Sequence, residues 1–174
     1  MTTNFLQSIT NQSTLSRIRR NHGLEHATIH ILSKRIKKVS LAGYSDSGGF
    51  WLMGNIPTEE VLPAVNEALR RLRAGEKELA IHPNCGTMFV TSGSLAGIAA
   101  AGAMMTAGRR WRDQLGRVPL AMTAATLALI IAQPVGFYLQ QHVTTSGDPE
   151  GLEVVSITPS KRGQLQAHRV VTRG

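Results

Sequence analysis

Two histidines and a glutamate lie within five residues near the start of the chain, at the spacing of a metal site. His22, Glu25 and His26 form the pattern His-x-x-Glu-His. On a helix, His22 and His26 project from one face a turn apart, with Glu25 beside them. Two imidazoles in this arrangement can hold Zn²⁺, which lowers the pKa of bound water to about 7, and the carboxylate can act as general base. The spacing therefore predicts a zinc site with Glu25 as the catalytic residue.

A catalytic zinc ion usually has three protein ligands, so one more is expected. Cys85 is the preferred candidate, because this single cysteine lies in a Pro-Asn-Cys-Gly turn and thiolate suits zinc. His82 lies three residues before it, and if both bind, four protein ligands would make the site structural. Further candidates are His30, Asp46, Glu59, Glu60 and Glu67.

The same residues could also have purely structural roles. Paired histidines on a helix also serve structural metal sites or donate hydrogen bonds in a polar core, and Cys85 can be a small apolar residue at a helix start. Gly23 costs about 1 kcal/mol relative to alanine inside a helix, so it either argues against a helix here or marks a close backbone approach beside the histidines. His142 and His168 have no partner pattern and are expected at the surface.

The residues that must position this motif predict a small α+β domain over residues 13–88. A helix is expected from Ser13 or Thr14 to about residue 35, and a second from Thr58 to about residue 75. Between them, residues 39–44 and 50–54 flank a Ser-Asp-Ser-Gly-Gly turn and predict a β-hairpin, with 50–54 as a sheet edge for substrate. Within the domain, residues 79–82 are expected to form a short strand. Residues 1–12, which precede the domain, are expected to form a tail.

Two uncharged apolar runs, residues 89–108 and 118–141, are each long enough for a helix that crosses a hydrocarbon core of about 30 Å. They predict a transmembrane hairpin. Gly93 and Gly97 would let another helix approach closely, so a membrane-protein partner or self-association is expected at this face. Residues 142–174 are expected to form a C-terminal tail, with a possible β-hairpin.

Charge and composition narrow the function and the location. The net charge of +8 is dispersed, and without aromatic platforms it favours attraction to lipid headgroups over nucleic-acid binding. Residues 1–13 lack the apolar core of a signal peptide, and one cysteine excludes a disulfide framework. The arginines of residues 109–117 favour a cytoplasmic loop. Moving the long basic N-terminal part across a membrane without a signal is less favourable, so a cytoplasmic soluble part is expected.

Two resemblances add to these expectations. The five residues from His22 to His26 resemble the motif of the inverted zincins, the insulysin and pitrilysin class of metallopeptidases. This resemblance implies His22 and His26 as ligands and Glu25 as base, while the third ligand of that class matches no position here. The motifs His-Gly-Leu-Glu-His-Ala, Ile-His-Pro-Asn-Cys-Gly-Thr and Thr-Thr-Ser-Gly-Asp-Pro resemble a family of small bacterial membrane proteins from cyanobacteria and Chloroflexi, whose function is uncharacterised.

Together these features predict a zinc-dependent hydrolase, peptidase-like, anchored in the bacterial inner membrane by two spans. The alternative is an accessory or assembly subunit of a larger membrane complex, in which the histidines have a structural role.

Overall fold

The computed structural model describes residues 13–162 and 165–174, so the expected tail at residues 1–12 lies outside the described part. The chain divides into two compact units. The first contains the residues up to His82 together with those from Gln141 onward, and the second contains residues 83–140. The C-terminal residues therefore belong to the same unit as the His-x-x-Glu-His motif.

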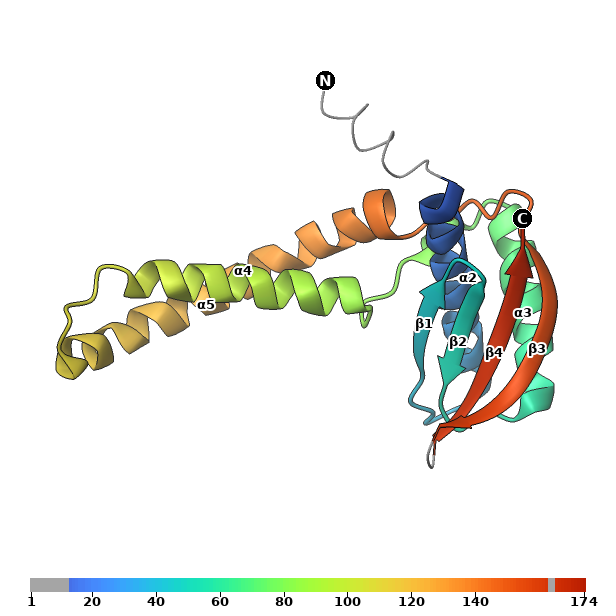
Figure 1. Ribbon diagram of the computed structural model, residues 1–174, viewed down its shortest axis with the longest axis horizontal. Helices are drawn as coiled ribbons and strands as arrows, with labels where there is room; N and C mark the ends of the chain where they lie inside the picture. Colours follow the sequence, from blue (N-terminus) through green and yellow to red (C-terminus); the bar gives the residue numbers. More distant parts are fainter. Residues whose placement is uncertain (1–12, 163–164) are drawn as a thin grey trace, which may run out of the picture. The chain divides into compact units, whose positions relative to one another are not determined.

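The first unit is built on a four-stranded antiparallel sheet with the order β1-β2-β4-β3 (Figure 1). Its strands are β1 (Ala42–Asp46), β2 (Gly49–Met53), β3 (Glu153–Arg162) and β4 (Leu165–Arg173). The two predicted hairpins are present, and they join through β2 and β4, where Phe50 pairs with Val170. The expectation that residues 50–54 form a sheet edge is wrong, because β4 covers that side of β2. The edge strands are β1 and β3.

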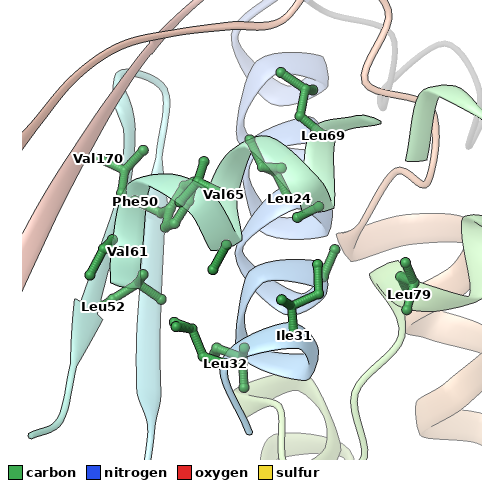
Figure 2. Close-up of a cluster of buried hydrophobic side chains, with 14 of the residues drawn as sticks. Leu24, Ile31, Leu32, Phe50, Leu52, Val61, Val65, Leu69, Leu79 and Val170 are labelled. Atoms are coloured by element: carbon green, nitrogen blue, oxygen red, sulfur yellow. The ribbon is translucent and has the colours of Figure 1, made fainter. Parts of the chain in front are cut away.

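Two helices, α2 (Ser13–Arg35) and α3 (Thr58–Arg73), cover one face of this sheet (Figure 1). Both predicted helices are confirmed. Their apolar residues and those of the strands form one core, in which Leu24 and Leu32 of α2 lie with Val65 of α3 and Phe50 of β2 (Figure 2). The first unit is thus an α+β domain with a helical layer on an antiparallel sheet, and α2 is held in place by this core.

The segment expected as a short strand at residues 79–82 is instead a 3₁₀ turn, η1 (Lys77–Ala80). A strand needs a neighbour for its backbone hydrogen bonds, and this segment is not paired in the four-stranded sheet. One turn of 3₁₀ helix buries Leu79 and Ala80 while it satisfies its backbone locally. The carbonyl groups of Ala80 and Ile81 accept hydrogen bonds from His26 and His30 of α2.

The second unit consists of two helices, α4 (Gly86–Met104) and α5 (Trp111–Leu139), and α5 continues into a π-helical turn, η2 (Gln140–Thr144). Part of the loop expected at residues 109–117 is helical, because α5 already begins at Trp111. Both helices are long and apolar enough to cross a membrane. Their large apolar side chains are mostly exposed, with Phe89 at 67%, Ile98 at 70% and Ile130 at 63%.

The two helices approach each other closely at Gly136, where an added Cβ would lie 2.5 Å from the Met88 sulfur. This contact does not involve Gly93 or Gly97, the two positions at which a close helix approach was predicted. An added Cβ at Gly93 or Gly97 would meet no heavy atom within 4 Å in the described part of the chain. The α4–α5 contact therefore leaves open space at those two glycines.

Candidate metal centre

Helix α2 buries five polar or charged residues, and each has a hydrogen-bond partner: Arg20, Asn21, Glu25, His26 and Thr28. Asn21 donates from its amide to the Asp46 carbonyl at 2.8 Å and accepts from the Thr172 hydroxyl at 2.7 Å. Thr28 donates to the Leu24 carbonyl. Buried polar groups cost free energy unless they are paired, so this network holds α2 in one register against β1 and β4. The residues of the motif lie within this stretch.

The rings of His22 and His26 lie side by side on α2, as their spacing predicts. Their centroids are 4.4 Å apart in an edge-to-face arrangement, and one ring nitrogen of each lies within 4.8 Å of the other. His26 is 2% exposed, whereas His22 is half-buried. The pair is therefore open to solvent on the His22 side.

Each of these histidines has one ring nitrogen held by a backbone carbonyl. The Nδ1 atom of His22 lies 2.9 Å from the Thr144 oxygen, and that of His26 lies 2.7 Å from the Ala80 oxygen. A carbonyl oxygen can only accept, so both Nδ1 atoms carry hydrogen. In the neutral rings, both lone pairs are then on Nε2, which is the state of a metal-ligating histidine oriented by its second partner.

The segment that supplies the Thr144 carbonyl lies unusually close to α2. The Ser146 amide donates to the Arg19 carbonyl at 2.9 Å, and a Cβ at position 23 would lie 2.0 Å from the Ser146 oxygen. No side chain fits there. The prediction that Gly23 marks a close backbone approach beside the histidines is confirmed, and the missing side chain lets Thr144 reach His22.

Glu25 points toward the sheet. It is 3% exposed and accepts a hydrogen bond from the hydroxyl of Ser45 on β1. Its carboxylate covers Gly43, where an added Cβ would lie 2.0 Å from the Glu25 Oε1 atom. Burial raises the pKa of Glu25, although the Ser45 hydrogen bond and the charge of His22 act in the opposite direction. The carboxyl group is thus desolvated, positioned by one donor, and electrostatically linked to the first histidine.

Two further histidines adjoin the pair. His82 has its ring centroid 5.7 Å from that of His26 and 5.0 Å from that of His30. The Nε2 atom of His30 donates to the Ile81 carbonyl at 2.9 Å. Burial lowers the pKa of His82 to about 4, and the neighbouring charges of His26 and His30 lower it as well. His82 is therefore neutral at physiological pH.

Cys85 belongs to the second unit, where it is the residue before α4. It follows His82 by three residues, so their Cα atoms can be at most about 11 Å apart along the chain. Its role as third ligand stays a prediction from the sequence.

The carboxylates that were further candidates are engaged elsewhere or exposed. Asp46 forms two 2.8 Å hydrogen bonds with Arg169, which lower its pKa, and Glu67 pairs with Arg35. Glu60 lies 3.4 Å from Arg35, and Glu59 is exposed at the start of α3. These ion pairs give each paired carboxylate a partner other than a metal.

The expectation for His168 is wrong. This residue is 2% exposed in β4, and its Nε2 atom lies 3.0 Å from the Thr58 hydroxyl. The sequence suggested a C-terminal tail, but the segment is an interior strand, and His168 lies on its core face opposite the buried Leu52 of β2. His142 is exposed, as expected.

A cavity of about 480 Å³ lies on the first unit beside Ala80 and Ile81, whose carbonyl groups hold His26 and His30. Ala80 and Thr145 contribute to its wall, together with Arg19 and Lys77. The residues that line it within the described ranges do not include Glu25, His22 or His26. The cavity is thus separate from the carboxylate of the motif.

Comparisons with known proteins place the chain in a family of unknown function. Residues 17–157 match the model of a domain of unknown function, DUF6391. An uncharacterized protein of the cyanobacterium Picosynechococcus sp. is 37% identical over 139 residues, which cover 74% of this chain and 66% of the relative. The chain thus spans about two thirds of the length of that relative. No solved structure matches this chain. The protein that carries this histidine cluster belongs to the DUF6391 family.

Proposed function

We propose that this protein is a zinc-dependent hydrolase, anchored in the bacterial inner membrane and acting on peptides. The observation that supports this most is the matched pair of carbonyl hydrogen bonds at His22 and His26. These bonds direct two Nε2 lone pairs from one face of a helix, which is what a zinc site of this motif requires. His22 and His26 are the proposed ligands, with Cys85 as the third.

Zinc in such a site activates water for attack and polarises the scissile carbonyl. The protein must supply a base that accepts the proton, and Glu25 is the proposed base. A general base is most effective when its pKa lies near the working pH, and burial raises the pKa of Glu25 in that direction. Ser45 holds the carboxylate through its hydroxyl hydrogen bond. We expect Glu25 to accept the proton and then to donate it to the leaving amine.

An extended peptide is the proposed substrate because β1 is an edge strand. Peptides bind edge strands through main-chain hydrogen bonds, with alternate side chains setting specificity. Gly43 and Ser45 of β1 contact the Glu25 carboxylate. A peptide paired with β1 would therefore lie next to the strand residues that position the base.

Anchoring by α4 and α5 is the proposed location. Their exposed apolar side chains would be stable in lipid, and the 29 residues of α5 extend about 44 Å, enough for the hydrocarbon core and one interface. We propose that the first unit lies on the cytoplasmic side. Anchoring at the membrane would give the enzyme access to peptides near or within the bilayer.

The test uses the full chain purified in detergent, loaded with zinc and incubated with a peptide library read by mass spectrometry. We expect cleavage that chelation abolishes, and a loss of at least about 100-fold in Glu25→Gln. Glu59→Gln, at an exposed carboxylate on the same unit, is the matched control and should cleave like the wild type. Wild-type cleavage by Glu25→Gln, or purified protein without stoichiometric zinc, would contradict the proposal.

A second candidate function is a non-catalytic subunit of a larger membrane complex. The observation that favours it is the open space at Gly93 and Gly97, where a helix of another protein could approach the α4 backbone. In that case the histidines would bind a structural metal. A stable partner that co-purifies with the wild type but not with Gly93→Leu, together with normal growth of cells carrying Glu25→Gln, would favour this second function.

A further inference from the structure

The histidine cluster extends beyond the two residues of the motif. Four imidazoles of the first unit form a row in the order His22, His26, His82 and His30. Successive ring centroids are 4.4, 5.7 and 5.0 Å apart. Three members come from successive turns of α2, and His82 comes from the segment after η1. The row is longer than one metal ion needs.

Helix geometry prevents a single ion from using all of it. His22 and His30 are eight residues apart, which is about 12 Å along the helix axis. Nitrogen ligands of one zinc ion each lie about 2.0–2.1 Å from the metal, so two of them are no more than about 4 Å apart. An ion held by His22 and His26 therefore leaves His30 outside its shell.

His30 is nevertheless oriented in the same way as the two motif histidines. Its Nε2 atom donates to the Ile81 carbonyl at 2.9 Å, so its neutral ring has the lone pair on Nδ1. The next residue after Ile81 is His82, and this one hydrogen bond therefore holds the backbone of that segment against α2. The two rings meet edge to face at 5.0 Å. A structural histidine needs only one hydrogen bond, whereas His30 also has the imidazole ring of His82 beside its own.

Solvent can complete a shell at this end of the row. His30 and His82 are both half-buried, in contrast to His26. Two imidazoles with water in the remaining positions suit zinc, copper, nickel or cobalt, whereas magnesium and calcium prefer oxygen ligands. The ligand class of this position is thus a divalent transition-metal ion.

We propose that His30 and His82 form a second metal position beside that of His22 and His26, so that one chain binds two divalent transition-metal ions. This inference rests on the proposed use of His22 and His26 as ligands of the first ion. It assigns His82 to the second ion.

The experiment measures zinc stoichiometry by equilibrium dialysis of the full chain in detergent, and Co²⁺ spectra report the ligand geometry. His30→Gln is the informative variant, because the glutamine amide can still donate to the Ile81 carbonyl but has no lone-pair nitrogen. We expect two ions per chain in the wild type and one in His30→Gln and in His82→Gln. His142→Gln, at an exposed histidine outside the row, should still bind two.

Converse variants separate this inference from the proposed function. His22→Asn with His26→Asn should retain one ion, held by His30 and His82, and thermal unfolding of the metal-free variants shows that each is folded. One ion in the wild type that His30→Gln leaves unchanged would overturn the second position and leave the hydrolase proposal standing. Two ions, one of them lost in His30→Gln, together with no loss of cleavage in Glu25→Gln, would support the second position and overturn the hydrolase.

Discussion

The Nδ1 atom of His26 lies 2.7 Å from the carbonyl oxygen of Ala80, a residue 54 positions away in the chain. His22 is held in the same way by Thr144, which is 122 positions away. Ala80 lies shortly before α4 and Thr144 ends the turn after α5. The two chain connections to the apolar hairpin thus supply the carbonyl groups that orient the motif histidines.

Asparagine at position 26 should separate metal binding from folding. Its amide nitrogen occupies the place of Nδ1 and can donate to the Ala80 carbonyl, but it has no counterpart of Nε2. We expect His26→Asn to lose at least about 100-fold in zinc affinity while its metal-free unfolding free energy stays within about 1 kcal/mol of the wild type. His26→Leu leaves the buried carbonyl unpaired and should cost about 1–3 kcal/mol. Calorimetric titration and chemical denaturation measure the two quantities, and equal stability losses in both variants would contradict the hydrogen-bond role.

A methyl group at position 43 should displace the proposed base without removing the metal. In Gly43→Ala the new Cβ would lie 2.0 Å from Glu25 Oε1, so the buried carboxylate must move. We expect a stability loss of about 1–3 kcal/mol, retained zinc, and loss of cleavage. Gly151→Ala, where an added Cβ meets nothing within 4 Å, is the control and should change neither zinc content nor cleavage. Full cleavage by Gly43→Ala would show that the contact with β1 does not position the base.

Replacing Glu25 by glutamine should stabilise the metal-free protein at pH values above the pKa of Glu25. Burial raises the folded-state pKa of Glu25 above its ordinary value of 4.5, so the folded state binds the proton more tightly than the unfolded chain. The contribution of Glu25 to the free energy of unfolding of the wild type therefore decreases as the pH rises through the folded-state pKa. The stability difference between Glu25→Gln and the wild type should grow with pH from about 4.5 and then level off. Denaturation from pH 4.5 to 8 with a chelator present measures it, and a constant difference would contradict the raised pKa.

His168 should make the protein less stable in mild acid. Burial lowers the pKa of this interior histidine, so the unfolded chain, with a histidine pKa near 6.5, binds a proton more readily. Stability from this group is present above about pH 6.5 and decreases as the pH falls. His168→Gln can keep a hydrogen bond with Thr58 and should weaken this dependence. A remaining dependence is expected from His82, whose pKa is lowered in the same direction. Parallel profiles of variant and wild type between pH 5 and 7 would contradict the prediction.

The local features of the chain could be predicted from its sequence. Helix α2 has an apolar stripe that includes Leu24, Ala27 and Ile31, and the paired histidines follow directly from its 3.6-residue period. The turn residues 45–49 similarly indicated the hairpin of β1 and β2. The fold class followed from these elements, because two helices and a hairpin need a common core.

The long-range features were missed for physical reasons. The pairing of Phe50 with Val170 joins two hairpins from opposite ends of the chain, and a single sequence carries no signal for such pairing. It made β2 an interior strand and buried His168. The carbonyl groups of Ala80 and Thr144 were also not predictable, because every residue has a carbonyl and only the fold selects two of them. Ser45 is a common turn residue whose contact with Glu25 depends on the same packing.

X-ray absorption spectroscopy at the zinc edge of the full chain tests the central claim most directly. The site of His22 and His26 is measured in the His30→Gln variant, so that an ion held by His30 and His82 does not contribute to the spectrum. We predict one zinc per chain with two imidazole nitrogens at about 2.0–2.1 Å and one sulfur at about 2.3 Å, and loss of the ion in His22→Asn with His26→Asn. Zinc without imidazole ligands, or zinc that remains when both motif histidines are replaced, would contradict it.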